Sequence, residues 1–426
     1  MKRRDFLKTS AITSLLATFP TLLSAQTNYN GKLLVTVYAH GGWDTTSFCD
    51  PKINVEGQPI INNWAETLEV QTAGNIKYAP FADNAAFFSK HYKKMLVING
   101  IDGKTNSHER GEIYSLTGTM NDGYPSLAAL LAYTNKTNEL MPWVHNGFRP
   151  RSGQLLAPSL ITNSNELGKL KTLANTNLYR TDRTETYLPE EDLNLMRFFR
   201  ERLARARAND NKQMPKQKQQ YEKYMDATLS DSTFSDFISY VEAADTKDLD
   251  KNDGTYAQAV AAMASFKAGI SLSAELRVSN FDTHSNHDEN HAKKLTQLTN
   301  QVDLLWELAE QFNLQDRLVV QIVSDISRTP HYNAKGGKDH WVTNSTMIMA
   351  NNPSWGNRVV GASTEGHRPL AINFDTFEVD ENGTKIEPKH IMAAMRKYFL
   401  VNTSMFDLDT TQSLDIFNAS KSTVQS

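Results

Sequence analysis

Apolar runs along this chain end abruptly in polar residues and glycine. The run from Leu318 to Val323 is rich in Val and Ile, and it is followed at once by Asp325, Ser327 and Arg328. Buried strands of a parallel sheet have near-continuous hydrophobic runs, and α/β proteins place their sites where such strands end. The pattern therefore predicts a parallel strand with a functional site at its carboxyl end.

Two other apolar runs, at 33–38 and 271–278, end in the same way. The carboxyl ends of parallel strands meet at one edge of a sheet, so segments far apart in the chain can deliver Asp and His side chains to one place. The sequence thus predicts a folded metal site. The residues that follow the two runs are His40, Gly41, Gly42 and Asp44 after the first, and Asp282, Thr283, His284 and His287 after the second.

The remaining pattern predicts helices between strands. The clearest amphipathic helix ends near Asn313, and the alanine-rich segment 256–268 is expected to pack close to the sheet. Strand, helix and strand around this amphipathic helix predict a right-handed parallel βαβ unit, so the site-bearing strands should be parallel neighbours. Further strands are expected at 95–99, 143–145 and 346–350, and further helices from Ser107, at 125–133 and at 391–399.

The segment from about 180 to 250 differs in character, because Arg, Lys, Glu and Gln dominate it at helical spacing. Acidic residues at 190–192 and basic residues at Arg205 and Arg207 match the preference of a helix dipole. No Gly/Ser-rich or Pro-rich linker flanks the segment. It is therefore predicted to be a helical insertion or lid in a single domain, 26–426, with a solvated basic face.

Residues 1–25 predict an export signal. They combine a basic start, an apolar run too short to span a membrane, and a small-residue cleavage site at Leu23-Ser24-Ala25. Arg3 and Arg4 with the following Asp-Phe-Leu-Lys resemble the twin-arginine signal, and an ordinary secretory signal is the alternative. We expect the twin-arginine export machinery to deliver a folded bacterial protein to the periplasm or beyond.

Composition narrows the possible partners. The formal net charge of −3 gives no basic footprint for nucleic acid, so no nucleic-acid partner is expected. The single cysteine, Cys49, excludes a disulfide framework within the chain. No apolar run after the signal is long enough to span a bilayer, and no phosphate-cradling glycine motif indicates a nucleotide cofactor.

Two candidate site residues have structural alternatives. Ser107 stands at a predicted helix start, where unpaired amides and the helix dipole favour an oxyanion, so it is a candidate nucleophile. A plain N-cap explains the same position, and Asn106 with Glu109 fits a capping pattern. Asp44 is a candidate metal ligand or a cap of the next turn.

Histidine is concentrated beside the strand-end acids, with three between 284 and 291 and two more at 331 and 340. A lone histidine is usually structural, but imidazole and carboxylate groups together suit a divalent transition metal. Zn or Mn is expected first, with Mg or Fe as further options, whereas calcium prefers oxygen ligands only. The candidate ligands are Asp44, Asp282, His284, His287, Asp325, Asp339 and His340.

The motifs HGGWD, NSH, FDTH, SDISRTP and KDHW, in this order, resemble the DUF1501 family of exported proteins across essentially the whole mature chain. That family is similar in fold to the alkaline phosphatase and sulfatase superfamily. The resemblance implies an α/β fold, a three-layer α/β/α sandwich with a mostly parallel sheet. It also implies two divalent metals and an anionic substrate, a phosphate or sulfate ester, that is hydrolysed.

The resemblance further implies roles for single residues. His287 competes with His284 as a ligand, because neither has the superfamily's spacing from Asp282. Arg328 would either clamp an anionic oxygen or fix its own turn. One metal would be bound by Asp44, Asp325 and the nucleophile Ser107, and the other by Asp282, His284 and His340.

The chain departs from the family pattern at 325–327, where Asp-Ile-Ser replaces the expected Glu-Phe-Gly. The sequence after Cys49 also lacks the arginine of the Cys-x-Pro-x-Arg motif, which excludes a formylglycine mechanism. We therefore predict an exported metal-dependent hydrolase of phosphate or sulfate esters. The alternative is a non-catalytic member that binds an envelope glycan or a protein partner.

Overall fold

The structure, a computed structural model, describes residues 29–135, 141–146, 148–161, 188–208, 231–250, 253–401, 406–408 and 413–418. The predicted export signal at 1–25 lies outside these residues, as do 180–187 and 209–230 of the predicted insertion. The prediction of a single domain from 26 to 426 therefore stays a prediction.

An eight-stranded sheet forms the centre of the molecule. Its strands follow the order β12-β4-β11-β8-β1-β7-β5-β6. All run in one direction except β11, which is antiparallel to both of its neighbours, so the predicted mostly parallel sheet is confirmed. The strands are β1 (Leu33–Ala39), β4 (Met95–Asp102), β5 (Trp143–His145), β6 (Ser159–Leu160), β7 (Ser273–Val278), β8 (Leu318–Ser324), β11 (Thr343–Ala350) and β12 (Arg358–Val360).

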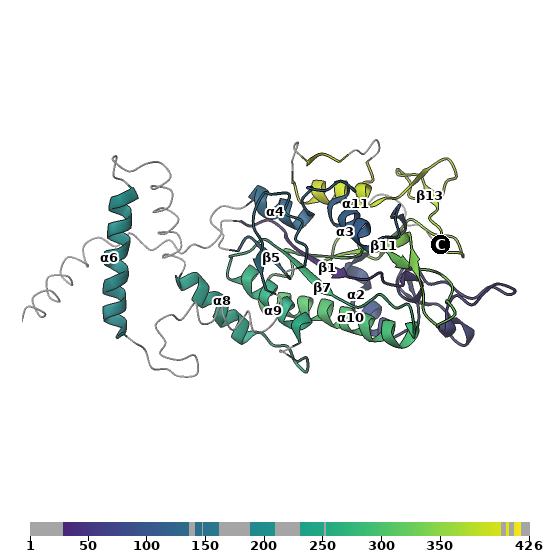
Figure 1. The fold of residues 1–426 in the computed structure, drawn as a ribbon, viewed down its shortest axis with the longest axis horizontal. Coiled ribbons are helices and arrows are strands. Elements are labelled where there is room, and N and C mark those ends of the chain that lie inside the picture. Colours follow the sequence, from purple (N-terminus) through teal and green to yellow (C-terminus); the bar gives the residue numbers. More distant parts are fainter. Residues whose placement is uncertain are drawn as a thin grey trace, which may run out of the picture.

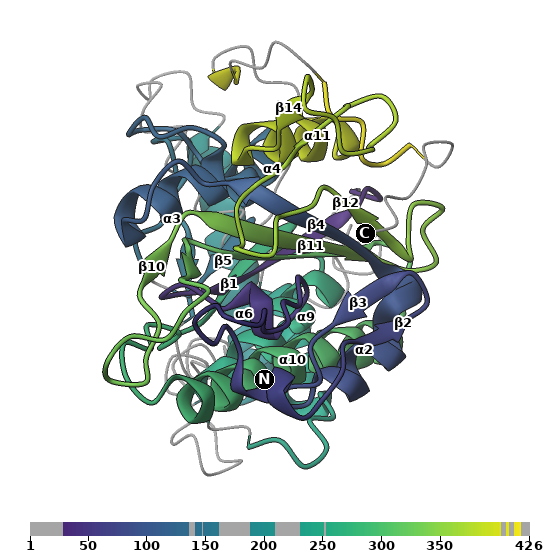
Figure 2. The same ribbon diagram turned by 90° about the vertical axis from the view of Figure 1, so that its right-hand side faces the viewer.

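Helices cover both faces of this sheet, which confirms the predicted three layers (Figures 1 and 2). Alternate side chains of β1 enter different cores: Val35 and Val37 pack with α9 and α10, whereas Leu34 packs with α4 and α11. Because both faces of β1 are buried, apolar residues occupy it without interruption. One face carries α3 (His108–Thr117), α4 (Leu127–Asn135) and α11 (Pro388–Tyr398), and the other α2 (Asn84–His91), α9 (Gly254–Lys267) and α10 (His287–Gln311).

The strands that carry the candidate site are parallel, as predicted, but β7 and β8 are not adjacent to each other. Strand β1 lies between them and pairs with both, so the crossover through α10 passes over one strand. Smaller elements lie outside the sheet. They are the pairs β2–β3 (Gln71–Ala73, Ile76–Tyr78), β9–β10 (Ser327–Arg328, His340–Trp341) and β13–β14 (Ala371–Ile372, Thr384–Lys385), and the 3-10 helices η1 (Thr45–Ser47), η2 (Asn63–Glu66) and η3 (Tyr92–Lys94).

Two helices of the predicted insertion are described, α6 (Glu190–Ala208) and α8 (Asp231–Ala243), and they confirm its helical character. Helix α8 packs on α9 and buries Phe237 and Ile238. Helix α6 stands apart from the layered body in Figure 1. Within the described residues, no helix has both the length and the apolar character needed to cross a membrane.

A double-glycine turn ends β1. Gly41 and Gly42 have φ angles of 107° and 80°, in the left-handed region that favours glycine. A Cβ atom on Gly41 would lie 2.7 Å from the Asp282 backbone nitrogen. Only glycine therefore lets the end of β1 approach the segment after β7 this closely, and the turn then carries Asp44 into the interior.

Asp44 is fully buried in an ion pair with Lys338. Its Oδ2 lies 2.6 Å from Lys338 Nζ and 3.1 Å from His287 Nε2, and its Oδ1 accepts a hydrogen bond from the Thr46 amide. Burial alone would raise the pKa of Asp44, but Lys338 and His287 outweigh it and hold that pKa well below its ordinary value. The ionised pair thus joins the turn after β1 to the loop that precedes His340.

A second buried acid, Glu275, lies in the middle of β7. Its Oε2 is 3.5 Å from His145 Nε2, but burial lowers the pKa of His145 to about 4, so this imidazole is uncharged near neutral pH. Burial also raises the pKa of Glu275 to about 7. The folded protein therefore binds a proton here under conditions in which an exposed glutamate is ionised.

Replacing Lys338 by Met leaves the Asp44 carboxylate buried without its cation. The free energy of unfolding should fall by about 3–5 kcal/mol, measured by urea denaturation at neutral pH. The double variant Asp44→Asn/Lys338→Met removes both charges and should recover part of the loss. Lys335→Met changes an exposed lysine of the same loop and is the control. A Lys338→Met protein as stable as the wild type would contradict the buried ion pair.

Glu275 should make stability depend on pH. Between its unfolded pKa of 4.5 and its folded pKa of about 7, the folded state holds a proton that the unfolded chain has lost. Its contribution to the free energy of unfolding should therefore fall as pH rises, by at most about 1.4 kcal/mol per pH unit. Urea denaturation of Glu275→Gln at several pH values in this range should lack this component. Identical pH slopes for variant and wild type would exclude the proposed proton.

Candidate metal centre

The carboxyl edge of the sheet gathers side chains from four parts of the chain. Asp325 follows β8, Asp282 and His284 follow β7, His108 begins α3, and His340 begins β10. The three strand ends singled out in the sequence do meet here, because β8, β1 and β7 are consecutive and parallel in the sheet. The start of α3 and the start of β10 add His108 and His340 to these strand ends.

Three of these side chains form the one group of potential metal ligands found in the described part of the chain. His108, Asp282 and His340 each offer a ligand atom, and these atoms all lie within 4.8 Å of one another. His284 lies beside this group, with its Nε2 3.0 Å from Asp282 Oδ1 and 3.1 Å from His340 Nε2. Two imidazoles and a carboxylate, or three imidazoles with His284, make a mixed nitrogen and oxygen donor set, which suits Zn, Mn or Fe.

His108 is oriented for such a role. Its Nδ1 lies 2.6 Å from Asp325 Oδ2, and this contact, opposed by burial, raises the pKa of His108. Its Nε2 is buried, has no hydrogen-bond partner, and lies 3.5 Å from Asp282 Oδ2. A carboxylate on one ring nitrogen and an unpartnered second nitrogen directed at another carboxylate are the features of a metal-binding histidine. The residues present therefore fit a metal.

Asp325 itself, a predicted ligand, lies behind His108. Its Oδ1 accepts hydrogen bonds from the Gly41 and Gly42 amides at 3.2 and 2.8 Å and from Ser324 Oγ at 3.0 Å, while Oδ2 contacts His108. Both oxygens thus have protein partners, and the side chain is fully buried. In this arrangement Asp325 positions an imidazole.

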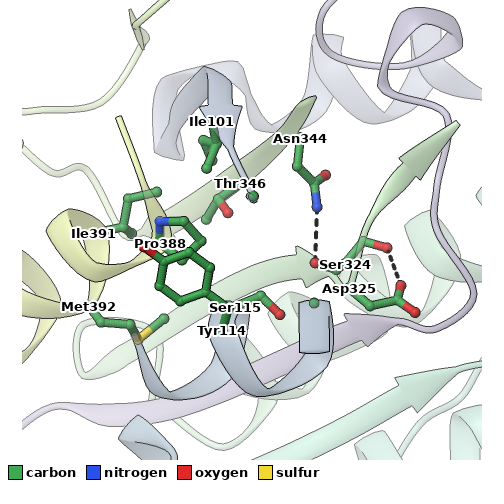
Figure 3. Close-up of a pocket in the computed structure, with 12 residues that line it drawn as sticks. Ile101, Tyr114, Ser115, Ser324, Asp325, Asn344, Thr346, Pro388, Ile391 and Met392 are labelled. Atoms are coloured by element: carbon green, nitrogen blue, oxygen red, sulfur yellow. Dashed lines mark hydrogen bonds between the residues drawn. The ribbon is translucent and has the colours of Figure 1, made fainter. Parts of the chain in front are cut away.

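A small cavity of about 20 Å³, lined in part by Asp325, lies between α3, β8, β11 and α11. Figure 3 shows Asn344 and Ser324 beside it, with the Asn344 amide donating to the Ser324 carbonyl and Ser324 Oγ donating to Asp325. A space of this size has room for about one water molecule and none for an ester substrate. This cavity is therefore not a substrate site.

Arg328 holds the turn and Asp282 together. It is fully buried, and its guanidinium donates to the carbonyl oxygens of Gly41, Gly42 and Lys338 and to Asp282 Oδ1, the last at 2.7 Å. Burial would raise the pKa of Asp282, but Arg328 outweighs burial and lowers it. Of the two roles left open by the sequence, the contacts correspond to the one that fixes the turn.

His284, not His287, joins the group. His284 Nδ1 lies 2.8 Å from Asp339 Oδ1, so Asp339 orients His284 in the way that Asp325 orients His108. His287 is buried at the start of α10, between Asp44 and the Thr283 hydroxyl. Although both histidines follow Asp282 closely in sequence, the beginning of α10 directs His287 into the interior.

The structure does not bring Asp44 to this group, because the oxygens of Asp44 contact Lys338, His287 and Thr46 instead. Ser107 is exposed at the N-cap position of α3, immediately before His108. It therefore occupies the position that the capping alternative predicts, but its hydroxyl makes no capping hydrogen bond, so both alternatives stay open. A second metal held by Asp44 has no counterpart among these contacts.

One side of the group carries positive charge. His40 lies next to His108, with ring centroids 6.2 Å apart, and its Nδ1 is 2.6 Å from an Arg277 nitrogen. Burial first, and Arg277 second, lower the pKa of His40 to about 4. Arg277 also stacks on Phe148, 3.7 Å from the ring centroid. The Arg277 guanidinium thus lies beside His40, whose ring stands between it and the candidate ligand His108.

Sequence reasoning did not select His108, His40 or Lys338 as candidate site residues, although His40 was noted at a strand end. A signal existed for His108, since the amide and dipole argument for Ser107 at a helix start applies equally to the next residue. His40 directly follows the first apolar run and was open to the same strand-end argument. Lys338 gave no signal, because nothing in the sequence indicates which acid a lysine will meet across 294 residues.

Comparison with curated proteins finds no match. Among solved structures, alkaline phosphatase from the Antarctic bacterium TAB5 is similar over 88% of this chain and 100% of its own, at 9% identity and a TM-score of 0.36. A 2-O GAG sulfatase matches over 92% and 75%, at 8% identity and 0.36. A protein in the alkaline phosphatase superfamily from Vibrio parahaemolyticus matches over 98% and 79%, at 9% identity and 0.36. At such scores nothing follows about activity.

The sequence matches a family described as "Protein of unknown function (DUF1501)" over residues 31–367. This range includes β1, α3, β7, β8 and β10, and therefore every side chain of the metal centre. The resemblance predicted from the motifs is confirmed, and the chain belongs to the DUF1501 family.

Proposed function

We propose that this protein is an exported, divalent-metal-dependent hydrolase of phosphate or sulfate esters. The observation that carries the proposal is the unpartnered Nε2 of His108, directed at Asp282 within 4.8 Å of a ligand atom of His340. The N-terminal sequence, with its paired arginines, supports delivery through the twin-arginine pathway to the periplasm or beyond.

His108, Asp282, His284 and His340 would hold the metal, with Zn or Mn as the metals that this donor set favours. A bound divalent ion lowers the pKa of water or of a hydroxyl nucleophile and stabilises negative charge on the ester oxygens. The family resemblance implies two ions. A measurement of the metal content per chain would show whether this centre binds one ion or two.

The protein's own residues prepare the site for an anionic ester. The Asp325 carboxylate accepts the Nδ1 proton of His108 and so leaves Nε2 as a bare donor atom. Arg328 keeps Asp282 ionised and in place from behind. Positive charge from Arg277, and the amides at the start of α3, are available to the oxygens of a bound phosphate or sulfate.

The proposed reaction also needs a site that the substrate can reach and a nucleophile. The side chains of Asp282 and His284 are 44% and 47% exposed, so a substrate can reach them without a movement of the body. Ser107 is exposed next to His108 and uses none of its hydroxyl for capping, which leaves it available as the nucleophile. Water is the alternative nucleophile.

Loss of a ligand should remove metal and activity together. His108→Ala and Asp282→Asn should each lose bound metal, measured by inductively coupled plasma mass spectrometry on natively exported protein. Both should also lose hydrolysis of generic aryl phosphate and aryl sulfate esters. Asp122→Asn, an acid with a 74% exposed side chain, is the matched control and should keep both properties.

Two outcomes would contradict the proposed hydrolase. A folded wild-type protein that refuses added Zn and Mn would exclude the metal centre. Bound metal without turnover of any ester would favour the non-catalytic alternative, a protein that binds an envelope glycan or another protein. Activity retained in Ser107→Ala would assign attack to water, and its loss with metal retained would assign it to the serine.

Asp325→Asn tests the role of the residue behind His108. An amide cannot serve as a charged acceptor for the His108 proton, so metal affinity should fall by about 10–100-fold. Chelator competition measures this on protein shown to be folded by circular dichroism. Glu112→Gln alters a buried acid on α3 that pairs with Arg151 instead of His108, and its metal affinity should stay unchanged. Equal affinities in Asp325→Asn and wild type would refute the assignment.

A further inference from the structure

The carboxylate of Asp44, which the family resemblance implies as a ligand of a second metal ion, is already fully used by the protein. Its Oδ1 lies 2.9 Å from the Thr46 amide and 2.7 Å from the Thr46 hydroxyl. Its Oδ2 lies 2.6 Å from Lys338 Nζ, 3.1 Å from His287 Nε2 and 3.2 Å from Ser47 Oγ. A carboxylate accepts about four hydrogen bonds. These contacts therefore leave neither oxygen to a metal ion.

Lys338 supplies the cation beside this carboxylate. Its side chain is fully buried, and its Nζ lies 2.6 Å from Asp44 Oδ2, 2.9 Å from Asn62 Oδ1 and 3.4 Å from Thr46 Oγ1. An ammonium group has three donors, and three oxygens are present to accept them. The Tyr332 ring also lies over Nζ, with its centroid 4.9 Å away, where the face of the ring attracts a cation. The surroundings thus form a complete site for an ammonium group.

Asn62 is oriented toward this ammonium group. Its side chain is fully buried, and its Nδ2 donates to the carbonyl oxygens of Lys52 and Thr46 at 2.9 and 3.3 Å. Because both amide protons are used in this way, the carboxamide directs its Oδ1 at Lys338. One carboxylate and two neutral oxygens balance a single positive charge. A divalent ion added beside Lys338 would leave excess charge in the interior, which is strongly unfavourable.

The segment that carries Lys338 is packed too closely to move aside for a metal ion. The Lys338 amide donates to the Thr283 carbonyl oxygen at 3.0 Å. A Cβ atom on Gly337 would collide with the carbonyl group of His284. The segment is thus fixed against the residues that follow β7, and it continues directly into His340. A shift that removed the ammonium group from Asp44 would displace this candidate ligand as well.

We propose that the Lys338 ammonium group takes the place of the second metal ion, so that the protein binds one divalent ion per chain, at the group that contains His108. This inference rests on the proposed metal centre and replaces the two ions that the family resemblance implies. Within the described residues, the one group of potential metal ligands does not include Asp44. One positive charge of the site is therefore part of the chain, and a chelator can remove only the other.

The number of bound ions tests this inference. Wild-type protein is saturated with Zn or Mn, freed of excess metal by gel filtration, and analysed by inductively coupled plasma mass spectrometry with the protein quantified by amino-acid analysis. We expect one ion per chain, and none in His108→Ala. Two ions per chain would overturn the inference and leave the proposed hydrolase intact. No ion in the wild type would overturn the proposed metal centre, and the inference with it.

The double variant Asp44→Asn/Lys338→Met tests the assignment of Asp44. It removes both charges of the buried pair, so no charge is left unpaired in the interior. The folded variant should still bind one ion with the affinity of the wild type, measured by chelator competition on protein checked by circular dichroism. Asp50→Asn/Lys52→Met removes another buried ion pair, with Nζ and Oδ1 3.0 Å apart, and is the matched control. Loss of the ion from the folded Asp44→Asn/Lys338→Met protein but not from this control would overturn the inference, because Asp44 would then be a metal ligand.

Discussion

The buried carboxylate of Asp325 is the group on which the candidate metal centre depends. One oxygen accepts the amides of the Gly41–Gly42 turn, and the other contacts His108. The end of β8, the turn after β1 and the start of α3 therefore meet at a single charge. Hydrogen bonds to an ionised acceptor are shorter and stronger than neutral ones, and a buried network with every member satisfied has one geometry. The His108 ring has that geometry imposed on it before any ligand arrives.

Two strand-end aspartates that look alike in sequence have opposite roles. Asp44 is buried and neutralised by Lys338, so it stabilises the loop that ends at His340. Asp282 is half exposed and meets Arg328 on its inner side, which leaves its outer side to the group with His108 and His340. The two cations differ accordingly. Lys338 meets its carboxylate as a point charge, whereas the fork of Arg328 binds three carbonyl groups in addition to the acid.

The fold was largely predictable from the pattern of apolar residues. Strands buried on both faces give uninterrupted apolar runs, whereas helices buried on one face give apolar residues at three- and four-residue spacing. Strand ends also located the site, since Asp282, His284, Asp325 and His340 do converge. The assignments within the site were less predictable. Asp44 follows β1 as a ligand should, but whether a strand-end acid faces solvent or a buried lysine is decided by a loop far along the chain. His284 and His287 differ only in where α10 begins, and helix boundaries are the least certain part of any pattern. Nothing in the sequence of β7, β1 or β8 indicates that β1 lies between the other two strands in the sheet.

The contacts that build the site are among the least local in the molecule. The glycine turn reaches Asp325 across 283 and 284 residues, Asp44 reaches Lys338 across 294, and His108 reaches Asp325 across 217. Closing loops of this length costs chain entropy that is recovered only when the whole sheet has assembled, so such contacts form late in folding. No short fragment of the chain can therefore present the candidate ligands in this geometry. The proposed metal would bind only after the sheet has assembled, and its binding free energy would be added to the global stability of the sheet and not to one local element.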